Sequence, residues 1–401
     1  MVSIRSNNTL NSPDKTYWSA IFALFMGVTS LIAAEFIPVS LLTPIAHDLH
    51  ITEGQAGQSI TMVGIFAVIT SLLLAPLTKK INRKSVLLTL SILLILSNVI
   101  VALAPNYFMM LIGRTILGIC VGGFWSMASA VVLQLAPSKN IPRALSIVYA
   151  GVSVATIISL PLASYLGNII GWRNIFLIAA AFSFIALIFQ LFALPTLPPN
   201  RHNNFKNMFA LLKQNWVLMG IIGTVFSYGG YHLFFTYLRP FLDHNLALQA
   251  NPLTLVLLVF GLTNCLGTFI AGLILGRFFR PIMIGMHIVL ACIAILLLSS
   301  IGDMTIKIAL IMIWGFIFGF ITVGWSTWIT RTLADKAELI GGLLVAAIQF
   351  SIGMAAGIGG FTFDNFGIGA IFIASTLIFI MAAIITTFCF SLYKHATGKL
   401  A

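Results

Sequence analysis

The chain has 401 residues, of which 60% are hydrophobic and only 7% are charged, and its formal net charge is +12. Soluble domains carry about 25% charged residues, so this composition excludes a water-soluble protein. The apolar runs are about 20 residues long and lack the two-residue alternation of transmembrane β-strands, so we expect an all-α integral membrane protein in a lipid bilayer.

Twelve transmembrane helices are predicted from the lengths of the apolar runs and the polar or proline-containing breaks between them. The longest polar break runs from Pro195 to Asn215, near the middle of the chain. It divides the chain into a six-helix half (residues 1–194), a cytoplasmic linker (195–215) and a second six-helix half (216–401). The predicted spans are residues 18–44, 55–77, 85–104, 107–135, 143–167, 173–194, 216–239, 252–276, 281–301, 305–330, 338–362 and 368–393.

Basic residues gather in alternate connections between these spans. Cytoplasmic loops of membrane proteins carry an excess of Lys and Arg, so the pattern predicts that both chain termini are cytoplasmic. Because the positive charge accounts for orientation, we expect no nucleic-acid partner. The basic residues of these connections are Lys79, Lys80, Arg83, Lys84, Lys139, Arg143, Arg201, Lys206, Lys213, Arg277 and Arg280.

The two halves resemble each other weakly in sequence. The segment 122–126, Gly-Gly-Phe-Trp-Ser, returns as Val-Gly-Trp-Ser at 323–326, about half the chain length further on. Repeated halves around a site near the middle of the bilayer are a common design of secondary transporters. This repeat supports the division into two six-helix halves.

Glu35 lies inside the first apolar run, and Arg114 is the other clear charge at membrane depth. At a rise of 1.5 Å per residue, both lie about 10–13 Å below the outer surface. Charged residues at such depth usually face a protein interior or a watery cavity. Burial favours the neutral form of an acid and a nearby arginine favours its charged form, so an acid between these influences can bind and release a proton. A static ion pair between the two side chains, or an Arg114 that binds backbone carbonyls, are the structural alternatives.

An aromatic stretch in the seventh predicted span is a candidate wall of a substrate pocket. Tyr228, Tyr231, His232 and Phe235 share one helix face at three- and four-residue spacing. Aromatic walls stack on planar rings, and hydroxyls orient polar edges. Further candidates are Trp125, Trp325, Trp328, Gln58, Asn264 and Gln349. Ordinary packing between helices is the alternative for each of them.

No metal or cofactor is expected. His47 and His50 flank Asp48 just after the first span, where a solvated loop is the better interpretation than a metal site. The cysteines all lie inside apolar runs and have no paired spacing in a polar loop, so we interpret them as small hydrophobic residues. They are Cys120, Cys265, Cys292 and Cys389.

Several motifs resemble those of the major facilitator superfamily. The segment from Arg114 to Gly118 is similar to the fourth-helix signature of its proton-coupled exporters, and Glu35–Val39 is similar to the first-helix acidic motif of its drug and sugar efflux branch. The loop between the second and third spans departs from the family pattern, with Ala75 and Lys79 at its expected Gly and Asp positions.

Within that superfamily the chain resembles the bacterial purine ribonucleoside efflux pumps. The resemblance implies a secondary exporter of the inner membrane, not an enzyme, that exchanges purine ribonucleosides such as inosine and guanosine for protons. We expect a monomer. Because Glu35 and Arg114 are the only clear charges at membrane depth, we predict that Glu35 carries the proton and that Arg114 tunes this site. A broad-specificity drug or sugar efflux antiporter on the same scaffold is the alternative. The resemblance covers the segments 35–46, 53–59, 122–127, 234–240, 253–258 and 324–331.

Overall fold

The computed structural model describes residues 15–137, 140–198, 209–299, 303–333 and 337–398. Within these ranges the chain is almost entirely helical and holds no strand. The first half consists of α1 (Trp18–Leu49), α2 (Glu53–Leu77), α3 (Arg83–Ala102), α4 (Tyr107–Leu135), α5 (Ile141–Ile170) and α6 (Trp172–Ala193). The described part of the linker holds η2 (Leu211–Lys213). The second half consists of α8 (Asn215–Thr236), α9 (Leu238–Pro240), η3 (Phe241–Asn245), α10 (Ala250–Leu298), α11 (Met304–Thr332) and α12 (Ala337–Thr397).

Two of these helices are too long for one membrane crossing and are broken in the middle. Helix α10 has 49 residues and helix α12 has 61, whereas about 20 residues span a bilayer. In α10 the backbone leaves helical geometry at Phe278 (φ −120°, ψ 42°), just before Pro281. In α12 it does so at Gly367 (φ 72°, ψ −177°), a conformation that favours glycine. Each helix therefore supplies two of the predicted spans, and the ten helices of the described ranges that are long enough to span a bilayer yield twelve crossings.

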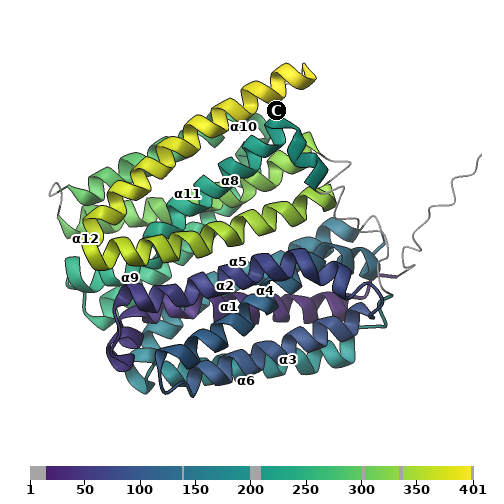
Figure 1. The fold of residues 1–401 in the computed structure, drawn as a ribbon, viewed down its shortest axis with the longest axis horizontal. Coiled ribbons are helices and arrows are strands. Elements are labelled where there is room, and N and C mark those ends of the chain that lie inside the picture. The colour runs from purple at the N-terminus through teal and green to yellow at the C-terminus, as the bar shows by residue number, and fades with distance from the viewer. Residues whose placement is uncertain (1–14, 138–139, 199–208, 300–302, 334–336, 399–401) are drawn as a thin grey trace, which may run out of the picture.

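The two ends of the helical bundle differ in what they hold. The start of α1 and the end of α12 lie at one end, here named the terminal end, on the right in Figure 1. The opposite end, here named the distal end, holds the turn at Gly171 and the break at Gly367. The helix bounds place the described basic loop residues Lys79, Lys80 and Arg143 at the terminal end. Lys139, Arg201 and Lys206 lie outside the described residues.

The buried hydrophobic residues form two clusters that divide along the bundle. One cluster joins the second half to the distal part of the first half, from residues such as Leu41, Ile60 and Leu160. The other cluster contains first-half residues from the terminal part, such as Leu24 and Val132, together with Leu197 of the linker. The apolar core thus runs across both halves at the distal end and is separate toward the terminal end.

Helices α2 and α12 approach each other closely in the distal part of the bundle. A Cβ added at Gly64 of α2 would lie 2.6 Å from the Cα atom of Gly353 of α12, far inside ordinary contact distance. Small residues allow backbones to approach in this way in membrane helices. This contact fixes the two halves against each other beside the candidate site.

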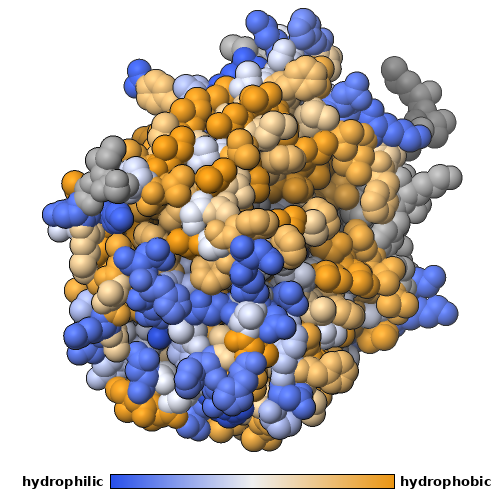
Figure 2. Space-filling view, turned by 60° about the vertical axis from the view of Figure 1, so that its left-hand side comes forward, coloured by the Kyte–Doolittle hydropathy of each residue, from blue (hydrophilic) through white to orange (hydrophobic). Residues whose placement is uncertain are grey.

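Large hydrophobic side chains cover the flanks of the bundle, as expected for a protein that faces lipid. Leu73, Phe192, Phe269 and Leu273 are each more than half exposed. Figure 2 shows hydrophobic side chains over the flank and hydrophilic ones gathered on the distal end. On the face shown in Figure 2, hydrophilic side chains therefore gather at the distal ends of the helices, where water would meet the membrane.

Candidate functional site

Two prolines interrupt the hydrogen bonding of helix α1. Pro38 and Pro44 lie inside the helix, and neither has an N–H group to donate to the carbonyl four residues earlier. The carbonyls left without that partner belong to Ala34 and Ser40. A buried carbonyl without a partner costs about 1–3 kcal/mol, so another donor is expected at each position.

Arg114 of α4 supplies the donor for the first of these carbonyls. Its Nη1 donates to the Ala34 carbonyl at 2.8 Å, and its Nη2 donates to the Glu35 carbonyl at 3.2 Å. Its Nε donates to the Ser59 carbonyl at 3.4 Å. Among the ion pairs of the described residues, none joins Arg114 to the Glu35 carboxylate. In this structure Arg114 therefore binds backbone, the second of the two structural alternatives.

The Glu35 carboxylate faces the other half of the molecule. It is buried, with 4% of the residue exposed, and its Oε1 accepts a hydrogen bond from Nε2 of Gln349 at 3.3 Å. Gln349 lies on α12, near its close contact with α2. The acid thus sits at the seam between the halves, where a relative movement of the halves changes its surroundings.

An aromatic cluster adjoins this acid. Phe36, the residue after Glu35, contacts Phe235 with ring centroids 5.7 Å apart. Phe235 stacks on Tyr231 at 5.3 Å, and His232 contacts both rings. Tyr228 stacks on His232 at 6.3 Å. The four predicted wall residues are all buried and form one connected group with Phe36 beside Glu35.

Besides Trp314, which stacks on Tyr231 with centroids 6.3 Å apart, sequence reasoning missed three phenylalanine rings of this cluster. Phe318 of α11 stacks on Tyr231 with centroids 3.7 Å apart, Phe260 of α10 stacks on Phe235 at 5.7 Å, and Phe36 comes from α1. The position of Phe36 next to Glu35 was the available signal for one of them. The other two belong to phenylalanine-rich helices, where sequence alone does not distinguish a site from packing.

The remaining predicted polar residues have other partners. Gln58 is exposed, and its Oε1 accepts a hydrogen bond from the Tyr107 hydroxyl at 2.9 Å. Asn264 is half-buried, and its Nδ2 donates to the Gly315 carbonyl at 3.2 Å. Asn264 is one helical turn from Phe260, so it lies near the cluster, whereas Gln58 belongs to the distal end.

The three predicted tryptophans lie closer to the terminal end. Trp125 is half-buried and stacks on Tyr149 with centroids 5.5 Å apart. Trp325 is fully buried, and its Nε1 donates to the Ser227 hydroxyl at 3.0 Å. Trp328 is fully buried against Trp216. The structure does not bring these tryptophans to Glu35, and their contact with a substrate stays a prediction.

Polar contacts join the two halves at the distal end. Asp364 of α12 accepts hydrogen bonds from the Thr52 hydroxyl and from the Gly54 amide, which lies in the first turn of α2. Glu53 pairs with Nε2 of His244 at 3.1 Å. Together with the shared apolar core, these contacts close the distal end of the bundle.

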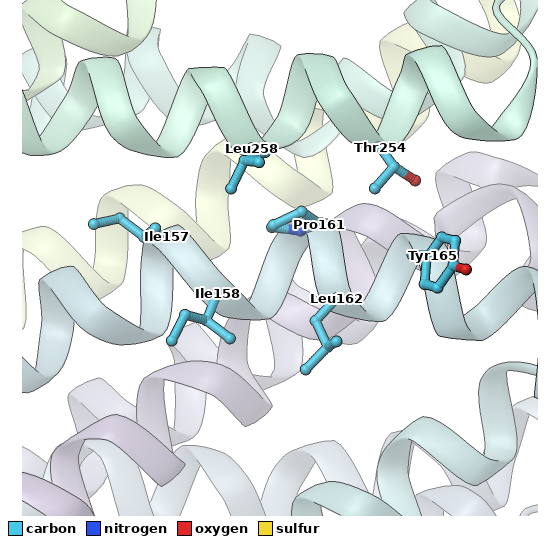
Figure 3. A pocket seen from close by; sticks show the side chains of 7 residues that line it. All are labelled: Ile157, Ile158, Pro161, Leu162, Tyr165, Thr254 and Leu258. Carbon is cyan, nitrogen blue, oxygen red and sulfur yellow. The ribbon is translucent and has the colours of Figure 1, made fainter.

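A shallow apolar groove lies on the flank, at the seam between α5 and α10. Its volume is about 300 Å³, and Figure 3 shows its lining side chains, with Pro161 on one helix facing Thr254 and Leu258 on the other. Leu162 is 45% exposed. Neither Glu35 nor the aromatic cluster lines the groove, so it is not the candidate site.

No group of three or more His, Cys, Asp or Glu side chains suited to a metal ion occurs within the described part of the chain. The stretch predicted as a solvated loop is instead the exposed last turn of α1, which ends at Leu49. There the Asp48 carboxylate pairs with Arg173 and accepts a hydrogen bond from Nε1 of Trp172 at 3.2 Å. The Asp48 carboxylate, between His47 and His50 in the sequence, is thus bonded to Arg173 and Trp172.

Twelve crossings in two halves, with a buried acid at the seam, define a secondary transporter. The sequence profile of the Major Facilitator Superfamily matches residues 18–343. The chain belongs to the Major Facilitator Superfamily, and it is a multi-pass membrane transporter, not an enzyme. The predicted twelve-helix fold is confirmed.

Purine ribonucleoside efflux pumps are similar in sequence to this chain over most of its length. Purine ribonucleoside efflux pump NepI of Salmonella paratyphi C (strain RKS4594) is 40% identical over 351 residues, which is 88% of each chain. NepI of Salmonella typhimurium (strain LT2) has the same identity and coverage. The resemblance to purine ribonucleoside efflux pumps is thus confirmed.

Solved structures share the fold at low sequence identity. A mutant of nucleoside transporter NupG superposes with a TM-score of 0.74 at 15% identity, over 93% of this chain and 99% of that one. A D-xylose-proton symporter superposes with a TM-score of 0.72 at 16% identity, over 96% and 98% of the two chains. These two likenesses concern the fold alone.

Proposed function

We propose that the chain exports purine ribonucleosides, such as inosine and guanosine, across the bacterial inner membrane in exchange for protons. The 40% identity to pumps named for purine ribonucleoside efflux supports this substrate class. The basic residues at the terminal end support cytoplasmic termini. The proposed working unit is a monomer.

The observation that carries the proposal is the buried Glu35 carboxylate at the seam between the halves, bonded by Gln349. An ionised acid at this depth costs about 2.5–3.5 kcal/mol on insertion scales. That cost falls when the acid binds a proton, or when hydrogen-bond donors of a substrate surround it. A nucleoside offers such donors in its ribose hydroxyls. Because the proton and the substrate compete for the Glu35 carboxylate, binding of one displaces the other. Such competition is the requirement for exchange.

The aromatic cluster supplies flat surfaces for a purine base beside this acid. Base–aromatic stacking is worth about 1–3 kcal/mol per base. Tyr231 and Phe318 lie almost parallel, at an interplanar angle of 11°, and Phe318 is only half-buried. We propose that the base stacks on the face formed by Tyr228, Tyr231 and Phe235, with the ribose toward Glu35.

Arg114 stabilises the backbone of α1 at Glu35. Its bonds to the Ala34 and Glu35 carbonyls keep the proline-broken turn of α1 in place without neutralising the carboxylate. The guanidinium is buried and adds positive charge behind the acid. In the proposed function, Arg114 thereby tunes how readily Glu35 releases its proton.

Transport in proteoliposomes tests the proposal. Uptake of labelled inosine, adenosine, a lipophilic cation and a sugar is measured with and without a pH gradient. We expect gradient-driven exchange of the nucleosides alone, and exchange of the cation or sugar instead would support the broad-specificity alternative. Glu35→Gln should abolish the effect of the gradient, whereas Asp303→Asn, at the exposed start of α11, changes charge equally and should not. Full gradient-driven exchange by Glu35→Gln would refute the proton assignment.

Binding measurements test the stacking face separately. Replacing Tyr228, Tyr231 and Phe235 together by alanine should weaken inosine binding by about fivefold to 150-fold, because about 1–3 kcal/mol of stacking is lost. Phe269→Ala removes a ring that is 67% exposed on the lipid-facing flank and is the control. Unchanged inosine affinity in the triple variant would exclude this face.

A further inference from the structure

The second proline of α1 frees a carbonyl whose new donor comes from the other half of the molecule. Pro44 leaves the Ser40 carbonyl without its helical partner. Nη1 of Arg239, in the short helix α9, donates to this carbonyl and also to the Ser164 hydroxyl of α5 at 3.5 Å. Ser40 and Ser164 belong to the first half and Arg239 to the second. This contact therefore bridges the halves.

The bridge is buried, and its charge is balanced locally. Arg239 is 5% exposed, and its Nε donates to Asp243 Oδ2 at 3.1 Å. The chain departs from a regular α-helix in this region, because α8 ends at Thr236 and the segment Phe241–Asn245 is a π-helix. Because Asp243 balances the positive charge of Arg239, the remaining N–H groups of Arg239 can donate to other acceptors without an unpaired buried charge.

We propose that Arg239 is a positioning residue of the transport cycle: its bond to the proline-freed Ser40 carbonyl holds the distal end closed, and it breaks whenever that end opens. Separation of the halves removes the donor from Ser40 and admits water, which then satisfies the carbonyl. The same carbonyl is thus paired in both states, once by Arg239 and once by solvent. Arg114 at Pro38 does not move in this way, because all its partners lie in its own half.

This inference rests on the twelve-helix fold and not on the identity of the substrate. Its experiment therefore measures distance and not transport. Spin labels are placed at Leu103→Cys and Met304→Cys, two exposed positions at distal helix ends in opposite halves, in a full-length chain whose native cysteines are replaced. Double electron–electron resonance in lipid nanodiscs then reports the populations of closed and open distal ends.

We expect Arg239→Gln to raise the ratio of open to closed populations by about tenfold or more, because a hydrogen bond from a charged donor is lost. Arg173→Gln removes an equal charge from the distal end within one half and should leave the ratio unchanged. Arg239→Lys keeps the charge and one donor, so it should show a smaller rise, and it serves if Arg239→Gln does not fold.

Repeating the Arg239 substitution in a Pro44→Ala variant tests whether its effect depends on the Ser40 carbonyl or on other partners of Arg239. Pro44→Ala supplies the missing N–H to that carbonyl, so Arg239→Gln should have a clearly smaller effect in this background. An equal rise in both backgrounds would overturn the assignment to Ser40. An unchanged ratio in both Arg239 variants would overturn the role of Arg239 altogether.

Discussion

Replacing Gln349 by leucine should shift the pH dependence of transport upward. Nε2 of Gln349 donates to the Glu35 carboxylate, and leucine has a similar size without a donor. A hydrogen bond to a charged group contributes about 1.5–3 kcal/mol, and about 1.4 kcal/mol corresponds to one pH unit. The distance of 3.3 Å is long for such a bond, so the lower end of this range applies. The lost bond stabilised the ionised acid, so the proton should stay bound to a pH about one unit higher.

Proton release on substrate binding provides the assay. Purified protein in weakly buffered detergent solution is mixed with inosine at a series of pH values, and the protons released per protein are read with a pH-sensitive dye. Gln349→Leu should move the midpoint of release up by about one unit. Gln190→Leu is the matched control, because Gln190 is equally buried but bonds to Ser91 within the first half. An unchanged midpoint, or one at lower pH, would refute the reasoning about Glu35 and Gln349.

Two further predictions concern the helix contacts around the site. Arg114→Leu should lower the melting temperature in detergent, because the Ala34 carbonyl loses its donor at a cost of about 1–3 kcal/mol. Pro38→Ala in the same chain should restore part of this loss, because it returns an N–H to that carbonyl. The absence of any rescue would contradict the pairing of Arg114 with the Ala34 carbonyl. Gly64→Ala places a Cβ 2.6 Å from the Gly353 Cα atom, so it should raise the open population of the distal spin-label pair. Gly272→Ala, where a Cβ meets nothing within 4 Å, is its control, and equal shifts in both variants would argue against a seam effect.

The sequence was sufficient to bring Glu35 and Arg114 to the same depth. Helical rise is constant, so counting residues from the predicted helix ends predicts height in the membrane. The structure agrees, since Arg114 donates to the Glu35 carbonyl. Counting does not predict rotation about the helix axis, which decides whether the guanidinium meets the carboxylate or the backbone. Pro38 favours the backbone, because it leaves the Ala34 carbonyl without its helical donor.

The aromatic candidates show a different limit. Tyr228, Tyr231, His232 and Phe235 were predicted from their spacing on one face, and they do gather beside Glu35. Trp125 and Trp325 occupy matching motifs in the two halves, yet Trp125 is half-buried and Trp325 is fully buried. Sequence repeats predict equivalent positions in the fold but not equivalent surroundings, because the two halves pack against different neighbours.

The two prolines of α1 have the same local effect on hydrogen bonding but different consequences for the contact between the halves. Each removes a helical hydrogen bond, and each freed carbonyl receives an arginine. At Pro38 the arginine comes from the same half, so the broken turn moves with that half as a rigid support for Glu35. At Pro44 the arginine comes from the other half, so the same kind of break joins the halves in one state only. The difference lies in which half supplies the donor, and it predicts opposite responses: loss of Arg114 should destabilise the fold, whereas loss of Arg239 should shift the balance between closed and open distal ends.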